Sequence, residues 1–167
     1  MILLNVTYTG HVPGVAKRRL PRMKKAAYTA AAVDWHQTAR PKHFSRAGAR
    51  EYNYKPRKGE RGNAHPKGFK RSYTGRKLAK YGHTLPLVYS GLTQGLTRQR
   101  DVRATATGCK VVIHAPGLNR RHPKSQITMR LEMTAVSDAD RQRAVASIDA
   151  ELQRQIQHDH TQHTIQI

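Results

Sequence analysis

The chain has 167 residues and carries 31 Lys and Arg residues against 10 Asp and Glu residues, a formal net charge of +21. This length suggests one domain. So large an unbalanced charge argues against a freely diffusing metabolic enzyme and favours a polyanion or an acidic partner nearby. Cys109 is the single cysteine, which excludes an intrachain disulfide and a Cys-based zinc finger. No apolar run approaches the ~18 residues of a membrane helix, so we expect no membrane partner.

The positive charge is concentrated in the first part of the chain. Residues 1–90 have a net charge of +17, residues 91–136 have +6 and residues 137–167 have −2. This asymmetry favours a basic surface that faces nucleic acid, with another part of the chain used for packing or assembly. The alternative is that these charges only form a solvated surface, as most Lys-rich surfaces do.

The N-terminal half predicts a strand, a long helix and an irregular basic segment. Residues 2–9 are rich in β-branched and aromatic types, which predicts a strand. Apolar residues recur three and four apart over residues 17–39, which predicts a helix that stops at the following Arg-Pro pair. Residues 41–83 contain three prolines and six glycines among many cations. We expect a long basic arm there, with short helices near residues 47–52 and 72–81.

The C-terminal half predicts a small sheet followed by a helix. Residues 97–107 and 109–115 have the composition of strands, and the Thr-Gly turn between them predicts a hairpin. The alternation of apolar residues at 126–136 predicts a further strand. Ser137 and the acidic residues after it are typical of a helix N-terminus, and this helix is expected to run to about residue 157. Its expected apolar stripe consists of Val145, Ile148, Leu152 and Ile156.

Together these elements predict an α+β fold. A small antiparallel sheet, made of the N-terminal strand and a three-strand meander, is expected to pack against a long N-terminal helix and a C-terminal helix. We expect a single domain over residues 1–157, with the basic arm at about residues 41–83. Residues 158–167 are expected to form a mobile His-rich tail.

Groups of residues that could perform catalysis are scarce. His158, His160 and His163 are close in sequence, but the tail offers no ordered support for a metal site. Cys109 lies in a predicted strand and is interpreted as a small buried hydrophobe rather than a nucleophile. The sequence contains neither a phosphate-binding glycine fingerprint nor the clustered carboxylates of a two-metal nuclease. We therefore expect a protein that is not an enzyme and that has no catalytic residues, no metal site and no cofactor.

The basic arm is the best candidate for a binding surface. Its aromatic rings could stack on bases while its cations follow phosphates. Equally, Phe44, Tyr52 and Tyr54 could pack the arm onto a neighbouring subunit. No base-reading helix is evident, so binding should be independent of sequence and strongly dependent on salt. The candidate polyanion-binding or inter-subunit residues are Lys42, Arg46, Arg50, Lys55, Arg57, Lys58, Arg61, Lys67, Lys70, Arg71, Arg76 and Lys77.

Two segments in the middle of the chain carry a resemblance to a known family. They read HFSRAGAREYNYKPR at residues 43–57 and KLAKYGHTLPLVYSGLTQGL at residues 77–96. With the hairpin, strand and helix expected after them, they resemble the tail-completion, or virion-morphogenesis, proteins of tailed bacteriophages. That family has a PLV-x-(S/T)-G segment before the sheet, although Leu92 stands where the family usually has an arginine. The residues that match it are Pro86, Leu87, Val88, Tyr89, Ser90 and Gly91.

The resemblance implies a structural virion protein at the head–tail junction. Proteins of this family form a ring in the phage neck that completes or terminates the tail and surrounds the DNA channel. It therefore implies a homo-oligomer that is made in the host cytoplasm and contacts neighbouring neck and tail proteins. DNA would lie nearby, in contacts that are independent of sequence.

Two other functions also fit the composition. A ribosomal or ribosome-associated protein that binds rRNA would have a similar charge and similar Gly-rich basic arms. A sequence-independent DNA-binding protein is the second alternative.

Overall fold

The computed structural model describes residues 14–55, 68–88, 90–120 and 128–164. Its contacts divide the chain into two compact units. Unit 1 comprises Met1–Ala39, Arg100–Val112 and Val136–Ile167, and unit 2 comprises Arg40–Gln99 and Ile113–Ala135. Each unit is described by itself below.

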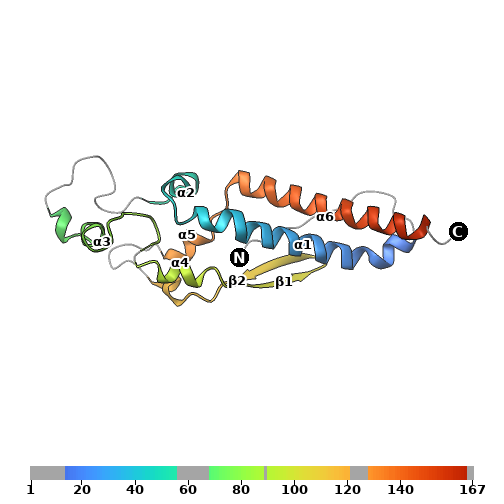
Figure 1. The fold of residues 1–167 in the computed structure, drawn as a ribbon, viewed down its shortest axis with the longest axis horizontal. Helices are drawn as coiled ribbons and strands as arrows, with labels where there is room; N and C mark the ends of the chain where they lie inside the picture. Colours follow the sequence, from blue (N-terminus) through green and yellow to red (C-terminus); the bar gives the residue numbers. More distant parts are fainter. Residues whose placement is uncertain (1–13, 56–67, 89, 121–127, 165–167) are drawn as a thin grey trace. The chain divides into compact units, whose positions relative to one another are not determined.

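Unit 1 contains two long helices and a β-hairpin (Figure 1). Its buried core brings together small side chains of both helices, Ala27 and Ala31 from the first and Ala144 from the last. Alanines favour helix formation and allow helices to approach closely. Tyr28 and Ile148 fill the remaining core volume and are 2% exposed. The elements are α1 (Gly14–Lys42), β1 (Asp101–Thr105), β2 (Gly108–Val112) and α6 (Asp138–Thr164).

Helix α1 confirms the predicted N-terminal helix but is longer at both ends. It begins at Gly14 and therefore contains Pro21 in its interior rather than in its first turn. It also continues through the Arg40-Pro41 pair, so the predicted stop there was wrong. The Arg40 guanidinium donates to the Thr97 hydroxyl at 3.1 Å, a tertiary contact that favours the helical geometry over the local preference of a residue before proline.

The β-hairpin is confirmed, with a two-residue loop at Ala106 and Thr107. Ala104 pairs with Cys109 across the ladder, and both pack against the core of unit 1. The strand expected at residues 126–136 was wrong, because Met129–Met133 forms helix α5. The sheet in the described part of the chain thus has two strands, and the strand expected at residues 2–9 lies outside that part.

Helix α6 begins with the predicted cap. The Ser137 hydroxyl accepts from the Asp140 N–H at 3.2 Å, and the Asp140 carboxylate accepts from the Ser137 N–H at 3.3 Å. The helix continues to Thr164, so its predicted end near residue 157 and a tail beginning there were wrong. The expected apolar stripe was partly wrong. Ile148 is 2% exposed, but Val145 is 48% and Ile156 is 42% exposed.

Unit 2 consists of short helices around a separate apolar core. Their bounds are α2 (Arg46–Glu51), η1 (Phe69–Arg71), α3 (Tyr73–Tyr81), α4 (Leu92–Leu96), η2 (Pro116–Asn119) and α5 (Met129–Met133). Thr128 caps α5 by accepting from the Leu131 N–H at 3.2 Å. This helix buries Met133 and leaves Leu131 64% exposed. The alternating apolar residues that predicted a strand therefore do not share one buried face. The buried core consists of Phe44, Leu87, Val88, Ala115, Leu118 and Met133.

The predicted α+β class is confirmed, with a long N-terminal helix, a C-terminal helix and an antiparallel sheet. The arm predicted at residues 41–83 contains the two expected short helices, α2 and α3. Among the described residues, no helix is long and apolar enough to span a membrane.

Candidate nucleic-acid interface

The net charge of the chain is divided unequally between the two units. Unit 2 has 19 Lys and Arg residues against three acidic residues, a net charge of +16. Unit 1 has 12 against seven, a net charge of +5. The three carboxylates of unit 2 neutralise three of its 19 positive charges, so most of that charge needs water, counterions or an anionic partner.

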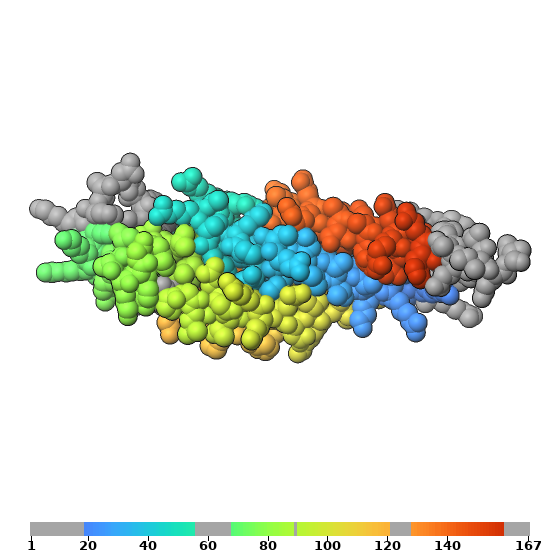
Figure 2. All heavy atoms as spheres, in the orientation of Figure 1, coloured from blue at the N-terminus to red at the C-terminus, as the bar shows by residue number. Residues whose placement is uncertain are grey.

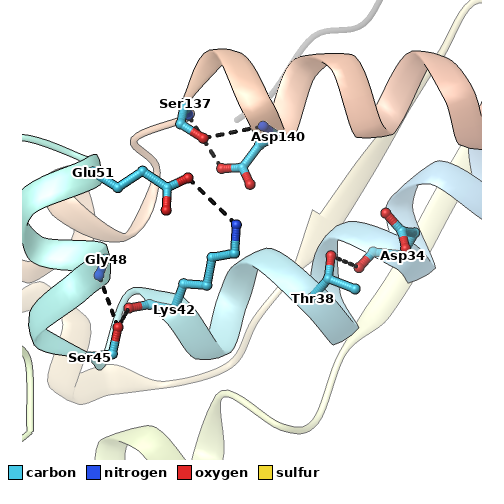
Figure 3. A network of polar contacts seen from close by, with 8 residues as sticks. All are labelled: Asp34, Thr38, Lys42, Ser45, Gly48, Glu51, Ser137 and Asp140. Atoms are coloured by element: carbon cyan, nitrogen blue, oxygen red, sulfur yellow. Dashed lines mark hydrogen bonds and ion pairs between the residues drawn. The ribbon is translucent and has the colours of Figure 1, made fainter.

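Helix α2 begins at a tight corner built around Ser45 (Figure 3). The Ser45 hydroxyl donates to the Lys42 carbonyl at 2.7 Å and accepts from the Gly48 N–H at 2.9 Å. A Cβ on Gly48 would lie far inside van der Waals contact with the Lys42 carbonyl, so only glycine allows the end of α1 to approach α2 this closely. We call this arrangement a Ser-Gly corner.

Helix α3 begins at a second Ser-Gly corner with the same geometry. The Ser72 hydroxyl donates to the Phe69 carbonyl at 2.6 Å and accepts from the Gly75 N–H at 3.0 Å. A Cβ on Gly75 would lie 2.7 Å from the Phe69 carbonyl carbon and 2.9 Å from the Lys70 Cα. Each corner fixes the direction of a short helix that carries arginines, because the capping serine satisfies a backbone donor that would otherwise lack a partner.

Each of these helices presents two cations on one exposed face. On α2, Arg46 and Arg50 are four residues apart and exposed. Arg76 and Lys80 have the same spacing and exposure on α3. Figure 2 shows atoms of α2 (turquoise) and α3 (green) at the surface of unit 2. We define the basic surface as the exposed cations in the described residues from position 46 to position 80. They are Arg46, Arg50, Lys55, Lys70, Arg71, Arg76 and Lys80.

Two of the predicted site residues serve the fold of unit 2 instead. The Lys42 ammonium forms an ion pair with Glu51 at 3.5 Å (Figure 3). Lys77 is 2% exposed and donates to the Leu85 carbonyl. A buried ammonium group requires such a partner because desolvation of its charge is costly. Neither side chain belongs to the basic surface.

Four further predicted residues, Arg57, Lys58, Arg61 and Lys67, lie outside the described residues. Lys80 belongs to the basic surface, although the arm residues singled out from the sequence did not include it. The signal was present, because Lys80 follows Arg76 by four positions within the helix expected at 72–81.

Three of the six aromatic side chains of the arm are buried within unit 2, whereas Tyr54 and Tyr81 are half-buried and Tyr73 is exposed. Phe44 is 3%, Tyr52 8% and Phe69 7% exposed. Tyr52 stacks on His43 with ring centroids 3.9 Å apart and planes within 5°. The Tyr54 hydroxyl donates to the Glu132 carbonyl at 2.8 Å and also bonds with His43 Nδ1. These rings thus pack in the chain's own core, which differs from both expectations, stacking on bases and packing onto a neighbour.

The segment that resembles the phage family lies at this core. Pro86, Leu87 and Val88 are buried. Leu87 has φ = 53°, a left-handed conformation that costs a leucine about 1–2 kcal/mol. Burial of its side chain contributes about 1.5–3 kcal/mol and offsets that cost. Ser90 is exposed, Gly91 adopts φ = 84° before α4, and Tyr89 lies outside the described residues.

Other groups considered from the sequence form no site among the described residues. Cys109 is half-buried against the core of unit 1, and burial raises the pKa of its thiol above 9.0, which favours the unreactive protonated form. The described residues contain no group of three or more His, Cys, Asp or Glu side chains that could hold a metal ion. The side chains of His160 and His163 lie outside the described set.

The fold and the charge define a class, a basic α+β protein in which one of the two units carries most of the net positive charge. Comparisons with models of known protein families, with curated proteins and with solved structures find no match for this chain. The charge, burial and contacts of the chain's own residues are therefore what supports a function.

Proposed function

We propose that the protein is a structural subunit of a bacteriophage neck or tail junction, where it forms a ring next to DNA. The observation that carries this proposal is the net charge of +16 on unit 2, where three acidic residues stand against 19 cations. A subunit that lines or borders a DNA channel gains from such a charge, because nearby phosphates relieve its self-repulsion.

Two further observations support an assembly role. The segment Pro86–Val88, which carries the resemblance to tail-completion proteins, is buried in the core of unit 2, so the matched residues belong to its framework. Leu92 of α4 is 69% exposed and Leu131 of α5 is 64% exposed. A ring interface would cover these side chains, although a contiguous apolar patch, rather than single residues, is what marks such an interface.

Negative-stain microscopy combined with mass measurement of the purified protein tests the proposal. We expect rings of defined mass that form without nucleic acid. If the protein stays monomeric alone and also when mixed with the neighbouring neck proteins, the ring proposal is wrong. Ordering only on structured RNA would instead support the rRNA-binding alternative.

A further inference from the structure

We propose that the basic surface of unit 2 binds the phosphates of a nucleic-acid duplex, with no recognition of bases. This inference deepens the proposed function and rests on it for the presence of nucleic acid. It adds which side chains make the contact and which form of nucleic acid they prefer. The chemistry recognised is the row of closely spaced phosphates along a double helix.

The first argument comes from the placement of like charges. Arg46 and Arg50 repel one another across one turn of α2, and Arg76 and Lys80 do so across one turn of α3. Such pairs destabilise a helix by about 0.2–0.5 kcal/mol each. No acidic residue is present in α3 to offset the repulsion. A duplex carries one negative charge per about 1.7 Å along its axis. Its phosphates would attract the cations of both pairs and so offset the repulsion within each pair.

The second argument comes from the rigidity of the supports. The two Ser-Gly corners fix where α2 and α3 begin, since each serine bonds the carbonyl before it and the glycine N–H after it. In addition, Arg46 donates to the Thr84 hydroxyl at 2.9 Å, which joins α2 to the segment that follows α3. The backbones that carry these cations are therefore held in place before binding, so the ordering cost is limited to the exposed side chains.

The third argument comes from the rings. Proteins that prefer single strands stack bases on exposed aromatic side chains, at about 1–3 kcal/mol per base. Near the basic surface, Phe44, Tyr52 and Phe69 are buried, and Tyr54 is partly buried with its hydroxyl bonded. Tyr73 is the large aromatic side chain exposed among the described residues, at 42%. Tyr81 on α3 is half-buried and lies beside His83, with ring centroids 6.2 Å apart. The described part of unit 2 therefore offers one well-exposed ring for stacking, and the higher charge density of a duplex favours it over a single strand.

Titration with fluorescent oligonucleotides over a range of salt concentrations tests this inference. The probes are a mixed-sequence DNA duplex, a second DNA duplex of different sequence, an RNA duplex of the same length and each corresponding single strand. We expect equal affinity for the two DNA duplexes and weaker binding of the single strands. Equal binding of the RNA duplex assigns the surface to duplex phosphates in general, and weaker binding assigns it to DNA.

A triple variant, Arg50→Gln, Arg76→Gln and Lys80→Gln, localises the contact. The slope of log K against log salt should fall in magnitude by about 2.7, or 0.9 for each lost phosphate contact. These side chains are exposed, so circular dichroism should show an unchanged fold. This measurement detects binding by single protomers as well as by rings, so its failure is separate from a failure of ring formation.

The matched control removes the same charge from unit 1, by replacing Arg22, Lys25 and Arg143, which are also exposed, with Gln. We expect the slope of the control variant to differ from the wild-type slope by less than about 0.9, the change that one phosphate contact makes. An equal loss in both variants would show diffuse attraction and overturn the proposal. Tighter binding of single strands, or no binding by the wild-type protein to any probe, would also overturn it, the latter assigning the charges to acidic protein partners.

Discussion

Replacement of Gly75 by alanine tests the close approach at the second Ser-Gly corner. The new Cβ would lie 2.7 Å from the Phe69 carbonyl carbon and 2.9 Å from the Lys70 Cα, both backbone atoms. Real Cβ atoms essentially never come this close, so helix α3 must shift away from η1. The shift would strain or break the bond between the Ser72 hydroxyl and the N–H of residue 75.

Three energies decide the sign of the effect. Overpacking against backbone costs about 1–3 kcal/mol, and loss of the serine cap adds about 0.5–2 kcal/mol. Alanine stabilises a helix by about 1 kcal/mol relative to glycine. The unfavourable contributions exceed the favourable one, so we expect Gly75→Ala to lower the free energy of unfolding by about 1–3 kcal/mol.

Urea unfolding followed by circular dichroism measures the effect. With a denaturant slope of about 2 kcal/mol per molar, the midpoint should fall by roughly 0.5–1.5 M. Gly95→Ala is the control, because no atom lies within 4 Å of the new Cβ in helix α4. It should leave the midpoint unchanged or raise it. A Gly75→Ala midpoint at or above that of wild type would refute the reasoning, as would an equal loss in both variants.

Three further predictions follow from burial, hydrogen bonding and ion pairing. Leu87→Ala should cost about 2–5 kcal/mol by emptying a buried position, whereas Leu92→Ala on the surface should cost almost nothing; equal midpoints in urea would contradict the assigned core. Tyr54→Phe should cost about 1–3 kcal/mol because two bonds of its hydroxyl are lost, and unchanged stability would argue against them. Hydrogen bonding from Arg154 lowers the pKa of the Glu151 carboxyl from its ordinary value of 4.5. The ionised carboxylate therefore stabilises helix α6 above that pH. This contribution to stability is lost as the pH falls through the lowered pKa. Glu151→Gln should therefore lose melting temperature relative to wild type at neutral pH and lose less at acid pH, while a difference that is constant with pH would count against the pair.

The elements that the sequence predicted well are those whose local signals agree with one another. The alanine-rich helix α1, the Ser137 cap of α6 and the hairpin each combine a propensity, a periodicity and a start or stop signal. The two short helices of the arm were also predicted close to their observed bounds, and the structure shows that a serine caps each of them. The charge excess of the arm follows directly from the numbers of its basic and acidic residues.

Residues 126–136 show where local reasoning failed. Alternating apolar residues predict a strand, but Met129–Met133 forms a helix that buries Met133 and exposes Leu131. A run of five residues has few local interactions of its own, so packing against the rest of unit 2 decides its conformation. The same holds for the end of α1, where the contact of Arg40 with Thr97 overrides the local effect of Pro41.

By itself, the sequence determined that this protein is strongly basic and mixed in secondary structure. The tertiary structure decided which cations face outward and which, such as Lys42 and Lys77, neutralise or anchor the fold. It also decided that Phe44, Tyr52 and Phe69 of the arm are buried rather than exposed for stacking. The physical reason is that charge and composition are sums over residues, whereas burial depends on which distant segments pack together.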